Sequence, residues 1–329
     1  MIAFLYAGQG SQKVGMGKDF YDNNQDYKEL LDDVRNEAGF DIEEISFTDK
    51  DGLINNTRYT QGCLAAFGAG VTKLLYKAGI HPDYVAGLSL GEYSALHASG
   101  AFSEKELIRL VGFRGKVMQE AANGLDTKMS AILGLSGDVI ANTLSKVNEK
   151  YAAENEERAK NNEMPLSVEI SNYNCKGQIV ISGASKLVSE AEEELKEAGA
   201  KRCVPLKVSS AFHTSYMTPA SKKLREYFDD VSKGLDIDNR ELKVPVLFNA
   251  IADKKGDKKI SDLLTAQVKR PVKMEQTIKK LKQLGVDTIV EIGPGKTLAG
   301  FVRKTVDGIK VYSIDSYEDY ENVVKEMAG

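Results

Sequence analysis

The sequence contains few of the residues that build disulfide frameworks and metal sites. Among 329 residues there are three cysteines and three histidines. Cys63, Cys175 and Cys203 stand far apart and form no CxxC pair, so a cysteine zinc site is not expected, and their odd number gives no disulfide framework. So few histidines also argue against a histidine-rich metal site. We therefore expect no bound metal.

Long apolar runs and an excess of positive charge are absent as well. No run of about 18 apolar residues occurs, so we expect no segment that spans a membrane. Residues 1–7 are apolar, but this run has no basic n-region and is too short for a signal peptide. Lys and Arg total 44 against 48 Asp and Glu, a net charge of −4, which argues against a nucleic-acid-binding protein. These absences predict a cytoplasmic protein with neither a membrane nor a nucleic-acid partner.

What is present is an alternation of apolar strands and periodic helices. Strands are predicted at 1–7, 84–88, 243–249, 286–292 and 310–314, and helices at 17–38, 60–78, 90–99 and 103–122. This alternation indicates an α/β fold with a mostly parallel sheet. The length suggests about two domains, or one large domain with an insertion.

The middle of the chain follows another pattern. Strands are predicted at 128–135, 166–172, 178–182 and 201–208, with helices at 137–150 and 185–198; the polar stretch 151–163 is either a helix extension or a loop. The order βαββαβ is typical of a ferredoxin-like unit. We therefore expect a large catalytic domain from residues 1–125 and 205–329, and an inserted ferredoxin-like subdomain at 126–204.

The strongest local motif is G-x-S-x-G at 87–91, between a predicted strand and a predicted helix. This context is typical of the nucleophile elbow of α/β-hydrolase-like folds. Glycine on either side permits a sharp turn, so the hydroxyl of Ser89 stands beside the amides of a helix N-terminus, which can stabilise an oxyanion. Such motifs also occur by chance in glycine-rich loops. The flanking strand and helix favour Ser89 as a nucleophile.

A serine nucleophile needs a base, and the chain offers three histidines. His81 precedes Pro82 and is most simply a loop residue. His97 lies about 12 Å from Ser89 along the following helix, too far to receive its proton. His213 follows a predicted strand end, where catalytic residues of α/β folds usually lie. Elimination favours His213, with an ordinary loop histidine as the alternative.

Arg114 stands at the centre of an apolar helix face. At about 100° per residue, six apolar residues lie within about 60° of it, namely Leu107, Leu110, Val111, Val117, Met118 and Ala121. A buried guanidinium must find an anion or remain at high cost. It either forms an ion pair with a buried Asp or Glu, or binds a substrate carboxylate, which its planar fork suits.

Two glycine-rich segments resemble nucleotide loops, and we reject both. Residues 8–12, GQGSQ, lack the third glycine of G-x-G-x-x-G because Lys13 occupies its place. Residues 293–297, GPGKT, would need glycine at position 290 for a Walker loop, and Val290 stands there. No nucleotide cofactor is expected.

Five segments together resemble the malonyl-CoA:acyl carrier protein transacylase family of type II fatty acid synthesis. They are GQGSQ at 8–12, GLSLGEYSAL at 87–96, FRGKVMQEA at 113–121, SAFH at 210–213 and VEIGPGKTL at 290–298. Their order along the chain is that of the family, and the resemblance covers essentially the whole chain. It implies an acyltransferase that moves malonyl from coenzyme A to the carrier protein through a malonyl-serine, with coenzyme A as a substrate and no cofactor.

The resemblance also implies roles for individual residues. Ser89 would be the nucleophile, His213 its base, and Arg114 the partner of the malonate carboxylate. The amides of Gln9 and Leu90 would form the oxyanion hole, and a backbone carbonyl at Gln267 would orient the histidine. The remaining candidates would contact substrate: Gln61, Phe212, Asn172, Asn174 and Arg202.

The sequence departs from the family's usual pattern beside the nucleophile and leaves other functions open. Leu88 stands where histidine is common, Ala7 where proline is common, and Gly62 follows Gln61 where proline is common. The alternatives are a serine esterase or thioesterase, a polyketide acyltransferase domain with another extender, and a non-catalytic carrier-binding module. Phe212 beside His213 disfavours a branched extender. Five basic residues are candidates for docking the acidic carrier: Lys222, Lys223, Lys269, Arg270 and Lys273.

Overall fold

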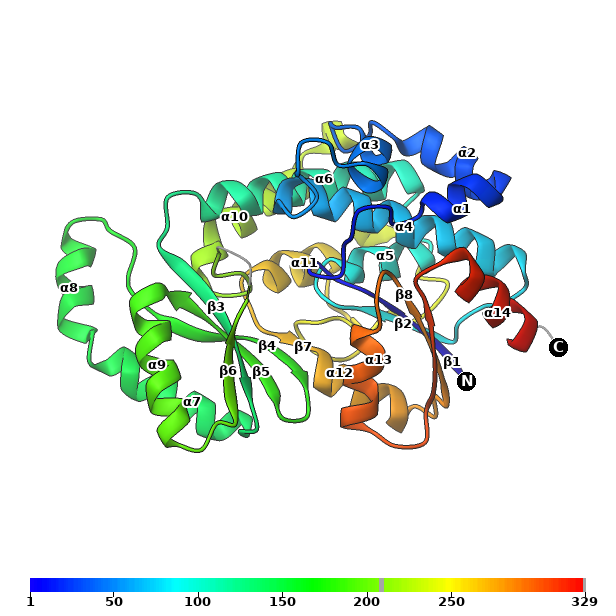
Figure 1. The fold of residues 1–329 in the computed structure, drawn as a ribbon. Coiled ribbons are helices and arrows are strands. Elements are labelled where there is room, and N and C mark those ends of the chain that lie inside the picture. Colours follow the sequence, from blue (N-terminus) through cyan, green and yellow to red (C-terminus); the bar gives the residue numbers. More distant parts are fainter. Residues whose placement is uncertain (207–209, 328–329) are drawn as a thin grey trace.

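The computed structural model describes residues 1–206 and 210–327, which are arranged around two β-sheets (Figure 1). The first sheet has the order β2-β1-β8-β9, and every neighbouring pair in it is parallel. Its strands are β1 (Ile2–Tyr6), β2 (Tyr84–Gly87), β8 (Thr288–Ile292) and β9 (Lys310–Ile314). The central strands β1 and β8 are almost fully buried, as parallel strands between helix layers are. The predicted α/β fold with a parallel sheet is confirmed.

The helices around this sheet come from both ends of the chain. The N-terminal part supplies α1 (Lys18–Asn23), α2 (Gln25–Val34), α3 (Ile42–Phe47), α4 (Thr57–Lys77), α5 (Gly91–Ala98) and α6 (Glu104–Ala122). The C-terminal part supplies α10 (Thr218–Asp229), α11 (Ile260–Val268), α12 (Met274–Gln283), α13 (Thr297–Thr305) and α14 (Tyr317–Met327), with the 3₁₀ turns η1 (Ser215–Met217), η2 (Val231–Lys233) and η3 (Ile237–Asn239). Helix α4 is buried along most of its length and packs against α2, α5 and α6.

Helix α6 begins with a reciprocal cap. The Oγ atom of Ser103 accepts a hydrogen bond from the amide of Glu106, while the Glu106 carboxylate accepts one from the Ser103 amide. This pair satisfies two free amides of the first turn. The helix predicted at 103–122 is confirmed, and this cap fixes its start and so the position of Arg114.

The second sheet has the order β6-β3-β5-β4-β7. It is built from β3 (Thr127–Leu133), α7 (Gly137–Glu149), β4 (Val168–Cys175), β5 (Gln178–Ala184), α9 (Ser185–Glu197) and β6 (Arg202–Pro205), so the predicted βαββαβ order is found. The β3–β5, β3–β6 and β4–β5 pairs are antiparallel. Helices α7 and α9 pack together against the sheet (Figure 1). The polar stretch after α7 forms α8 (Ala152–Lys160), which has no buried residue.

A short strand from the C-terminal part of the chain completes the second sheet. Strand β7 (Val272–Lys273) pairs in parallel with β4 through Asn172 and Tyr173. The sequence analysis did not predict this strand, because two residues are too few to show a period. The pairing brings the segment after α11 against β4, so both parts of the chain contribute to the space between the sheets.

Two predicted elements were wrong in part. The helix expected at 17–38 is divided into α1 and α2, because Asn24 is extended and its side chain caps α2 by accepting from the amides of Asp26 and Tyr27. The strand expected at 243–249 is reduced to two isolated bridges, between Val246 and Val85 and between Phe248 and Asp253. Proline at position 245 has no amide to donate, which limits pairing there. The strand predicted at 201–208 is longer than β6, which ends at Pro205, and residues 207 and 208 lie outside the described residues.

Candidate active site

Ser89 stands in a sharp turn between β2 and α5, at the carboxyl end of the parallel sheet. Its φ angle of +54° is in the left-handed region, which is costly for a residue with a side chain. Glycine is required on both sides. A Cβ on Gly87 would lie 2.0 Å from the carbonyl carbon of Gly91, and a Cβ on Gly91 would lie 2.2 Å from the carbonyl oxygen of Tyr6. The turn therefore has the geometry expected of a nucleophile elbow.

The imidazole of His213 lies between the nucleophile and a main-chain carbonyl. Its Nε2 atom is 2.7 Å from Oγ of Ser89, and its Nδ1 atom is 2.7 Å from the carbonyl oxygen of Gln267. A carbonyl can only accept, so in the neutral ring Nδ1 carries the proton and Nε2 is free to accept from Ser89. This is the pairing of a serine with a general base, oriented by a neutral acceptor.

Burial keeps this base uncharged. The side chain of His213 is buried, and burial, followed by the nearby charge of Arg114, lowers the pKa of His213 to about 4. The hydrogen bond to the Gln267 carbonyl opposes this shift without reversing it. His213 is therefore an unprotonated base at neutral pH. The alternatives His81 and His97 do not line the cavity into which Ser89 opens.

Arg114 is buried beside the nucleophile and has neutral partners. Its Nη1 atom donates to Oε1 of Gln61 at 2.6 Å, and its Nη2 atom donates to Oε1 of Gln267 at 3.0 Å and to Oγ of Ser89 at 3.2 Å. The Nε atom has no hydrogen-bond partner among the described residues. Burial lowers the pKa of Arg114 from its ordinary value, and the neighbouring Tyr93 opposes this shift most. No hydrogen bond joins Arg114 to a carboxylate in the described chain, so the structural ion pair is not formed there.

The side chain of Gln267 joins these groups. Its Oε1 atom accepts from Arg114, while its Nε2 atom donates to the carbonyl oxygen of Ser89 at 2.8 Å. Together with its main-chain bond to His213, Gln267 contacts all three residues that the sequence analysis placed at the centre of the site. The sequence analysis expected only the contact of the Gln267 carbonyl with His213. The side-chain amide of Gln267 also holds the guanidinium of Arg114.

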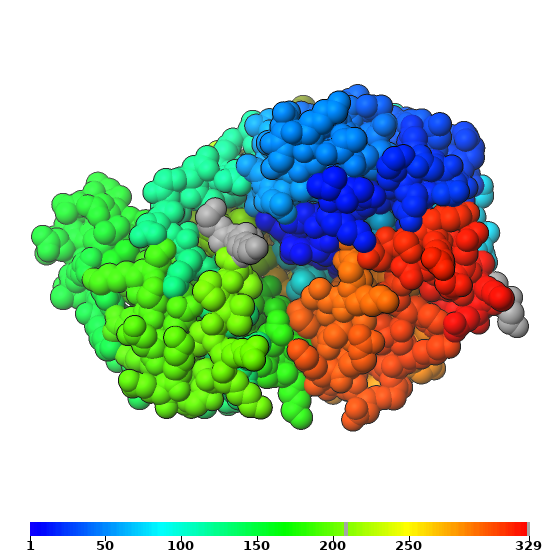
Figure 2. Space-filling model, in the orientation of Figure 1, coloured from blue at the N-terminus to red at the C-terminus, as the bar shows by residue number. Residues whose placement is uncertain are grey.

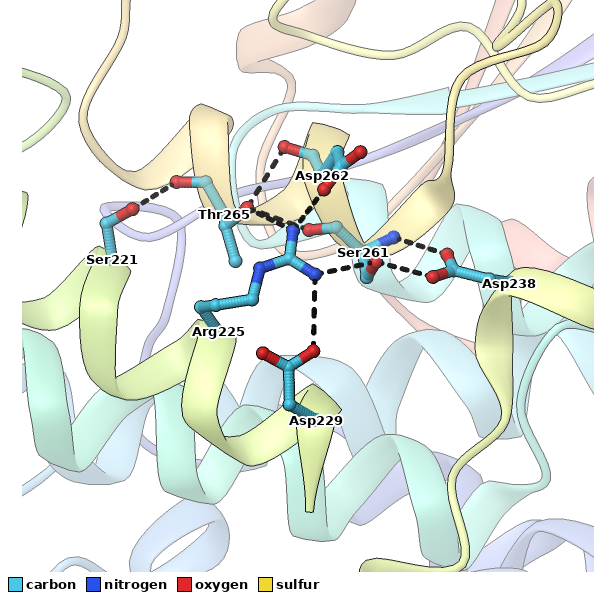
Figure 3. A network of polar contacts seen from close by, with 7 residues as sticks. All are labelled: Ser221, Arg225, Asp229, Asp238, Ser261, Asp262 and Thr265. Carbon is cyan, nitrogen blue, oxygen red and sulfur yellow. Dashed lines mark hydrogen bonds and ion pairs between the residues drawn. The ribbon is translucent and has the colours of Figure 1, made fainter. Parts of the chain in front are cut away.

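A polar network holds helix α11, on which Gln267 stands, against α10 and η3 (Figure 3). Arg225 of α10 donates to Oγ of Ser261 at 3.0 Å and to Oγ1 of Thr265 at 3.2 Å, and Ser221 donates to the carbonyl oxygen of Thr265 at 2.7 Å. The residues drawn in the figure are Ser221, Arg225, Asp229, Asp238, Ser261, Asp262 and Thr265. The network lies within a few residues of Gln267 and therefore limits the movement of the carbonyl that orients His213.

The two expected oxyanion donors come from separate loops that meet at the elbow. Leu90 is the N-cap residue of α5, where amides have no partner within the helix. Gln9 lines the cavity and follows Gly8, whose Cβ, if present, would lie 2.3 Å from the carbonyl oxygen of Leu88. Among the described residues, no hydrogen bond uses the amide of Gln9 or Leu90. Both amides are thus available to an oxygen atom.

A cavity of about 750 Å³ lies between the two sheets and has Ser89, His213 and Arg114 in its lining. Figure 2 shows a hollow where the green part of the chain, which carries the second sheet, meets the blue N-terminal and orange C-terminal parts. The lining also includes Gln9, Leu88, Phe212, Asn172 and Asn174. A volume of this size admits an acyl group and part of the thioester chain attached to it.

The remaining predicted substrate contacts divide into two groups. Asn172 and Asn174 project from the irregular strand β4 into the cavity, and Oδ1 of Asn174 has no hydrogen-bond partner among the described residues. Gln61 does not line the cavity. Its Oε1 atom accepts from Arg114, and its Nε2 atom donates to the sulfur of Met118. Arg202 stands on the edge strand β6 away from the lining, so the structure does not bring it to the site.

The sequence analysis missed Asn249 and Glu92. Asn249 bonds the amide of Ser89 and the carbonyl oxygen of Gly87, and Glu92, on the first turn of α5, accepts from the Asn249 amide. Burial raises the pKa of Glu92 to about 8. The signal for Glu92 was its place directly after the G-x-S-x-G motif, on a helix whose other residues are nearly all apolar or small. Asn249 gave no signal in the sequence.

The described residues contain neither a cluster of metal-binding side chains nor a membrane-length apolar helix. In residues 1–206 and 210–327, no group of three His, Cys, Asp or Glu side chains could hold a metal ion, and no helix is long and apolar enough to cross a membrane. The three cysteines are free, and burial raises the pKa of Cys63 to about 12. A thiol with such a pKa is not a nucleophile at neutral pH.

The fold and this site together define an acyltransferase. The chain belongs to the acyl transferase domain family, whose match covers residues 3–319. It is 37% identical over 327 residues to the malonyl CoA-acyl carrier protein transacylase of Bacillus subtilis, which covers 99% of this chain and 97% of that protein. The crystal structure of the same-named enzyme from Clostridium perfringens superposes with a TM-score of 0.89 at 37% identity, over 99% of this chain and 96% of that one.

A third relative is known with its partner. It is the malonyl-transacylase solved in complex with a type II polyketide synthase acyl-carrier protein. It matches this chain with a TM-score of 0.88 and 28% identity, over 99% of both chains. The family to which the sequence analysis assigned the chain is therefore confirmed.

Proposed function

We propose that this protein transfers the malonyl group from malonyl-CoA to the phosphopantetheine thiol of an acyl carrier protein and so supplies extender units for fatty acid synthesis. One observation supports this substrate above others. A buried guanidinium, Arg114, lies 3.2 Å from the nucleophilic oxygen of Ser89 and has only neutral hydrogen-bond partners. A cation in that place favours an acyl group with its own free carboxylate, as malonyl has.

The first half of the reaction follows from the Ser89–His213 pair. The Oγ atom of Ser89 forms a bond to the thioester carbonyl carbon while Nε2 of His213 takes its proton. The carbonyl oxygen becomes an oxyanion, and the amides of Gln9 and Leu90 donate to it. The carbon–sulfur bond then breaks, and the thiolate of coenzyme A receives the proton from His213. The product is a malonyl ester of Ser89.

The second half repeats these steps in reverse. The carrier's thiol gives its proton to His213 and attacks the ester, and the Ser89 oxygen leaves and regains the proton. An oxygen ester and a thioester exchange without oxidation or reduction, so the reaction as proposed needs neither a metal nor a nucleotide. Coenzyme A enters as a substrate and not as a cofactor. Water must be excluded from the ester, and the apolar side chains of Leu88, Met118 and Phe212 in the lining favour this.

The remaining assignments belong to the same proposal. Residues 126–204 would form an inserted ferredoxin-like subdomain on the α/β-hydrolase-like domain 1–125 and 205–329, and the strand order β6-β3-β5-β4 supports this division. Asn172 and Asn174, on β4, would contact the chain of coenzyme A with their amides. Arg202 does not line the cavity, so it would contact only a part of coenzyme A that extends out of it. The compartment would be the cytoplasm, where fatty acid precursors carry coenzyme A.

Three alternatives make different demands on the site. A serine esterase or thioesterase shares the elbow and the base but has no need of Arg114. A polyketide acyltransferase with a branched extender needs space beside His213, where Phe212 stands. A non-catalytic carrier-binding module needs neither the short Ser89–His213 contact nor a buried guanidinium beside it.

The test is mass spectrometry of the intact protein after incubation with malonyl-CoA, with and without an acyl carrier protein bearing its phosphopantetheine. We expect a mass increase of one malonyl group on Ser89, which is lost when the carrier is added and appears on the carrier. The variant Ser89→Ala is the control and should gain no mass. Release of free malonate without loading of the carrier would show a thioesterase instead.

A further inference from the structure

Asn249 contacts the nucleophile elbow from a distant part of the chain. Its side chain is fully buried, and 160 residues separate it from Ser89. The Oδ1 atom accepts a hydrogen bond from the amide of Ser89 at 2.7 Å, and the Nδ2 atom donates to the carbonyl oxygen of Gly87 at 2.7 Å. One carboxamide thus bonds the chain on both sides of Leu88, at the entry to the strained turn.

Asn249 is itself held by main-chain bonds in two directions. Its amide donates to the carboxyl group of Glu92, and its carbonyl oxygen accepts from the amide of Lys273 at 3.1 Å. Glu92 is fully buried on α5, the helix that starts at the elbow, and Lys273 is in β7 of the second sheet. The side chain of Asn249 is therefore fixed relative to both walls of the cavity.

These contacts have two consequences for Ser89. The left-handed conformation of a serine is unfavourable and persists only where the surroundings impose it, and the two bonds of Asn249 fix the peptide groups that lead into it. The amide of Ser89 is also occupied by Oδ1. The amide that the elbow can offer an oxyanion is therefore that of Leu90.

We propose that Asn249 is a positioning residue for acyl transfer: by bonding Gly87 and Ser89 it holds Oγ of Ser89 and the amide of Leu90 in the relative positions that the tetrahedral intermediate requires. This inference rests on the proposed function only in taking malonyl as the acyl group that is transferred. The geometry of the elbow applies to any ester that Ser89 attacks. The test therefore uses two substrates, malonyl-CoA and p-nitrophenyl acetate.

The variant Asn249→Ala removes both bonds. We expect the single-turnover rate of Ser89 acylation to fall about 100-fold or more with either substrate, as for the loss of an oxyanion donor, while KM for malonyl-CoA changes by less than about threefold. The matched control is Ser99→Ala. Ser99 is fully buried at the other end of α5, where its hydroxyl donates to the carbonyl oxygen of Leu96 at 2.8 Å, remote from the cavity lining. This control should lower the melting temperature but leave the acylation rate unchanged.

The variant Asn249→Asp gives a signature that a merely structural role would not. A protonated carboxyl group can donate to Gly87 and accept from Ser89, as the carboxamide does, whereas an ionised one can only accept. The acylation rate of this variant, divided by that of the wild type at each pH, should therefore rise at least tenfold as the pH is lowered from about 8 to 6. Glu92 of α5 is the titratable group in contact with Asn249, and His213 and Arg114 of α6 bond Oγ of the neighbouring Ser89. Division by the wild-type rate removes the pH dependence that these groups give the wild type.

Two results would overturn the inference. One is an Asn249→Ala enzyme that acylates Ser89 within threefold of the wild-type rate on p-nitrophenyl acetate, even if its melting temperature falls. The other is an Asn249→Asp enzyme whose rate relative to wild type does not change with pH. Failure of the wild type to react with malonyl-CoA, together with normal reaction with p-nitrophenyl acetate, would count against the proposed function and leave the role of Asn249 intact.

Discussion

His213 and Ser89 are 124 residues apart in the chain, yet their side chains meet at 2.7 Å. Both residues have a positive φ, +61° for His213 and +54° for Ser89. Such backbone conformations are unfavourable for residues with side chains and cluster at sites where tertiary contacts impose them. The strain on both partners indicates that the surrounding fold, and not local preference, sets the contact between nucleophile and base.

The first prediction concerns the pH range of the base. Because burial lowers the pKa of His213 to about 4, the imidazole stays neutral well below its ordinary titration range. The acylation rate should therefore remain nearly constant from pH 7 to about pH 5.5, where an unperturbed histidine with a pKa near 6.5 would already be mostly protonated. It should fall only as the pH approaches 4. Stopped-flow acylation with malonyl-CoA measures this, and circular dichroism at each pH checks that the fold is intact.

The variant His213→Ala tests the same assignment directly. It should slow acylation by about 10²–10⁴, the usual effect of losing a general base, and its rate should no longer depend on pH between 4 and 7. A near-normal rate would contradict the assignment and direct attention to His81 or His97.

The sequence was sufficient for the parts of the site that have a local pattern. Ser89 was found because glycine must flank a sharp strand–helix turn, and the close approaches at Gly87 and Gly91 show that physical reason. Arg114 was found because a charge at the centre of an apolar helix face is anomalous, and the side chain is indeed buried. His213 followed by elimination among three histidines.

The parts that could not be predicted depend on contacts between distant segments. The Gln267 amide meets the Ser89 carbonyl over 178 residues, and Asn249 meets the Ser89 amide over 160. Neither residue breaks a pattern in its own segment: Gln267 was named only through the family resemblance and only for its main-chain carbonyl, and Asn249 was not named. Strand β7 was missed for a similar reason, since two residues become a strand only through their partner β4.

The second prediction concerns the GPGKT segment, for which the sequence analysis expects no nucleotide role. Gly293 lies directly against the loop that contains Gln9, and a Cβ on Gly293 would stand 2.3 Å from Cβ of Ala7. The variant Gly293→Ala should therefore displace residues 7–9 and reduce acylation about tenfold or more, since small displacements of catalytic groups are costly. The matched control is Gly295→Ala, because Gly295 also has a positive φ, +82° against +143° for Gly293, but open space around its Cβ. Equal rates for the two variants would contradict this explanation.

The third prediction concerns docking of the carrier protein, which is acidic although this chain has a net charge of −4. The predicted basic residues lie on or near α10 and the segment after α11, and Lys222, Lys223 and Arg270 are exposed. Lys223 also pairs with Glu120 at 2.7 Å. Raised salt should slow transfer to the carrier more than acylation by malonyl-CoA.

A charge reversal separates docking from general electrostatics. Lys222→Glu should raise KM for the carrier severalfold and leave acylation by malonyl-CoA unchanged. The matched control is Lys146→Glu on α7, an exposed lysine that changes the net charge equally. Equal salt effects on both half-reactions, or equal effects of the two variants, would show that these lysines are only solvated helix faces.

The fourth prediction concerns the choice between malonyl and acetyl groups. Malonyl has a free carboxylate and acetyl has none, so only malonyl can form charge-assisted hydrogen bonds with Arg114, each worth about 1.5–3 kcal/mol. Arg114→Ala should lower the ratio of malonyl to acetyl kcat/KM about 100-fold or more, mainly by depressing malonyl transfer. Arg114→Lys should recover little, because an ammonium group lacks the planar fork that now bonds Gln61 and Gln267 at once. Melting temperatures of both variants are the control for folding. A constant ratio together with a large loss of stability would show that Arg114 only holds its two glutamine partners in place.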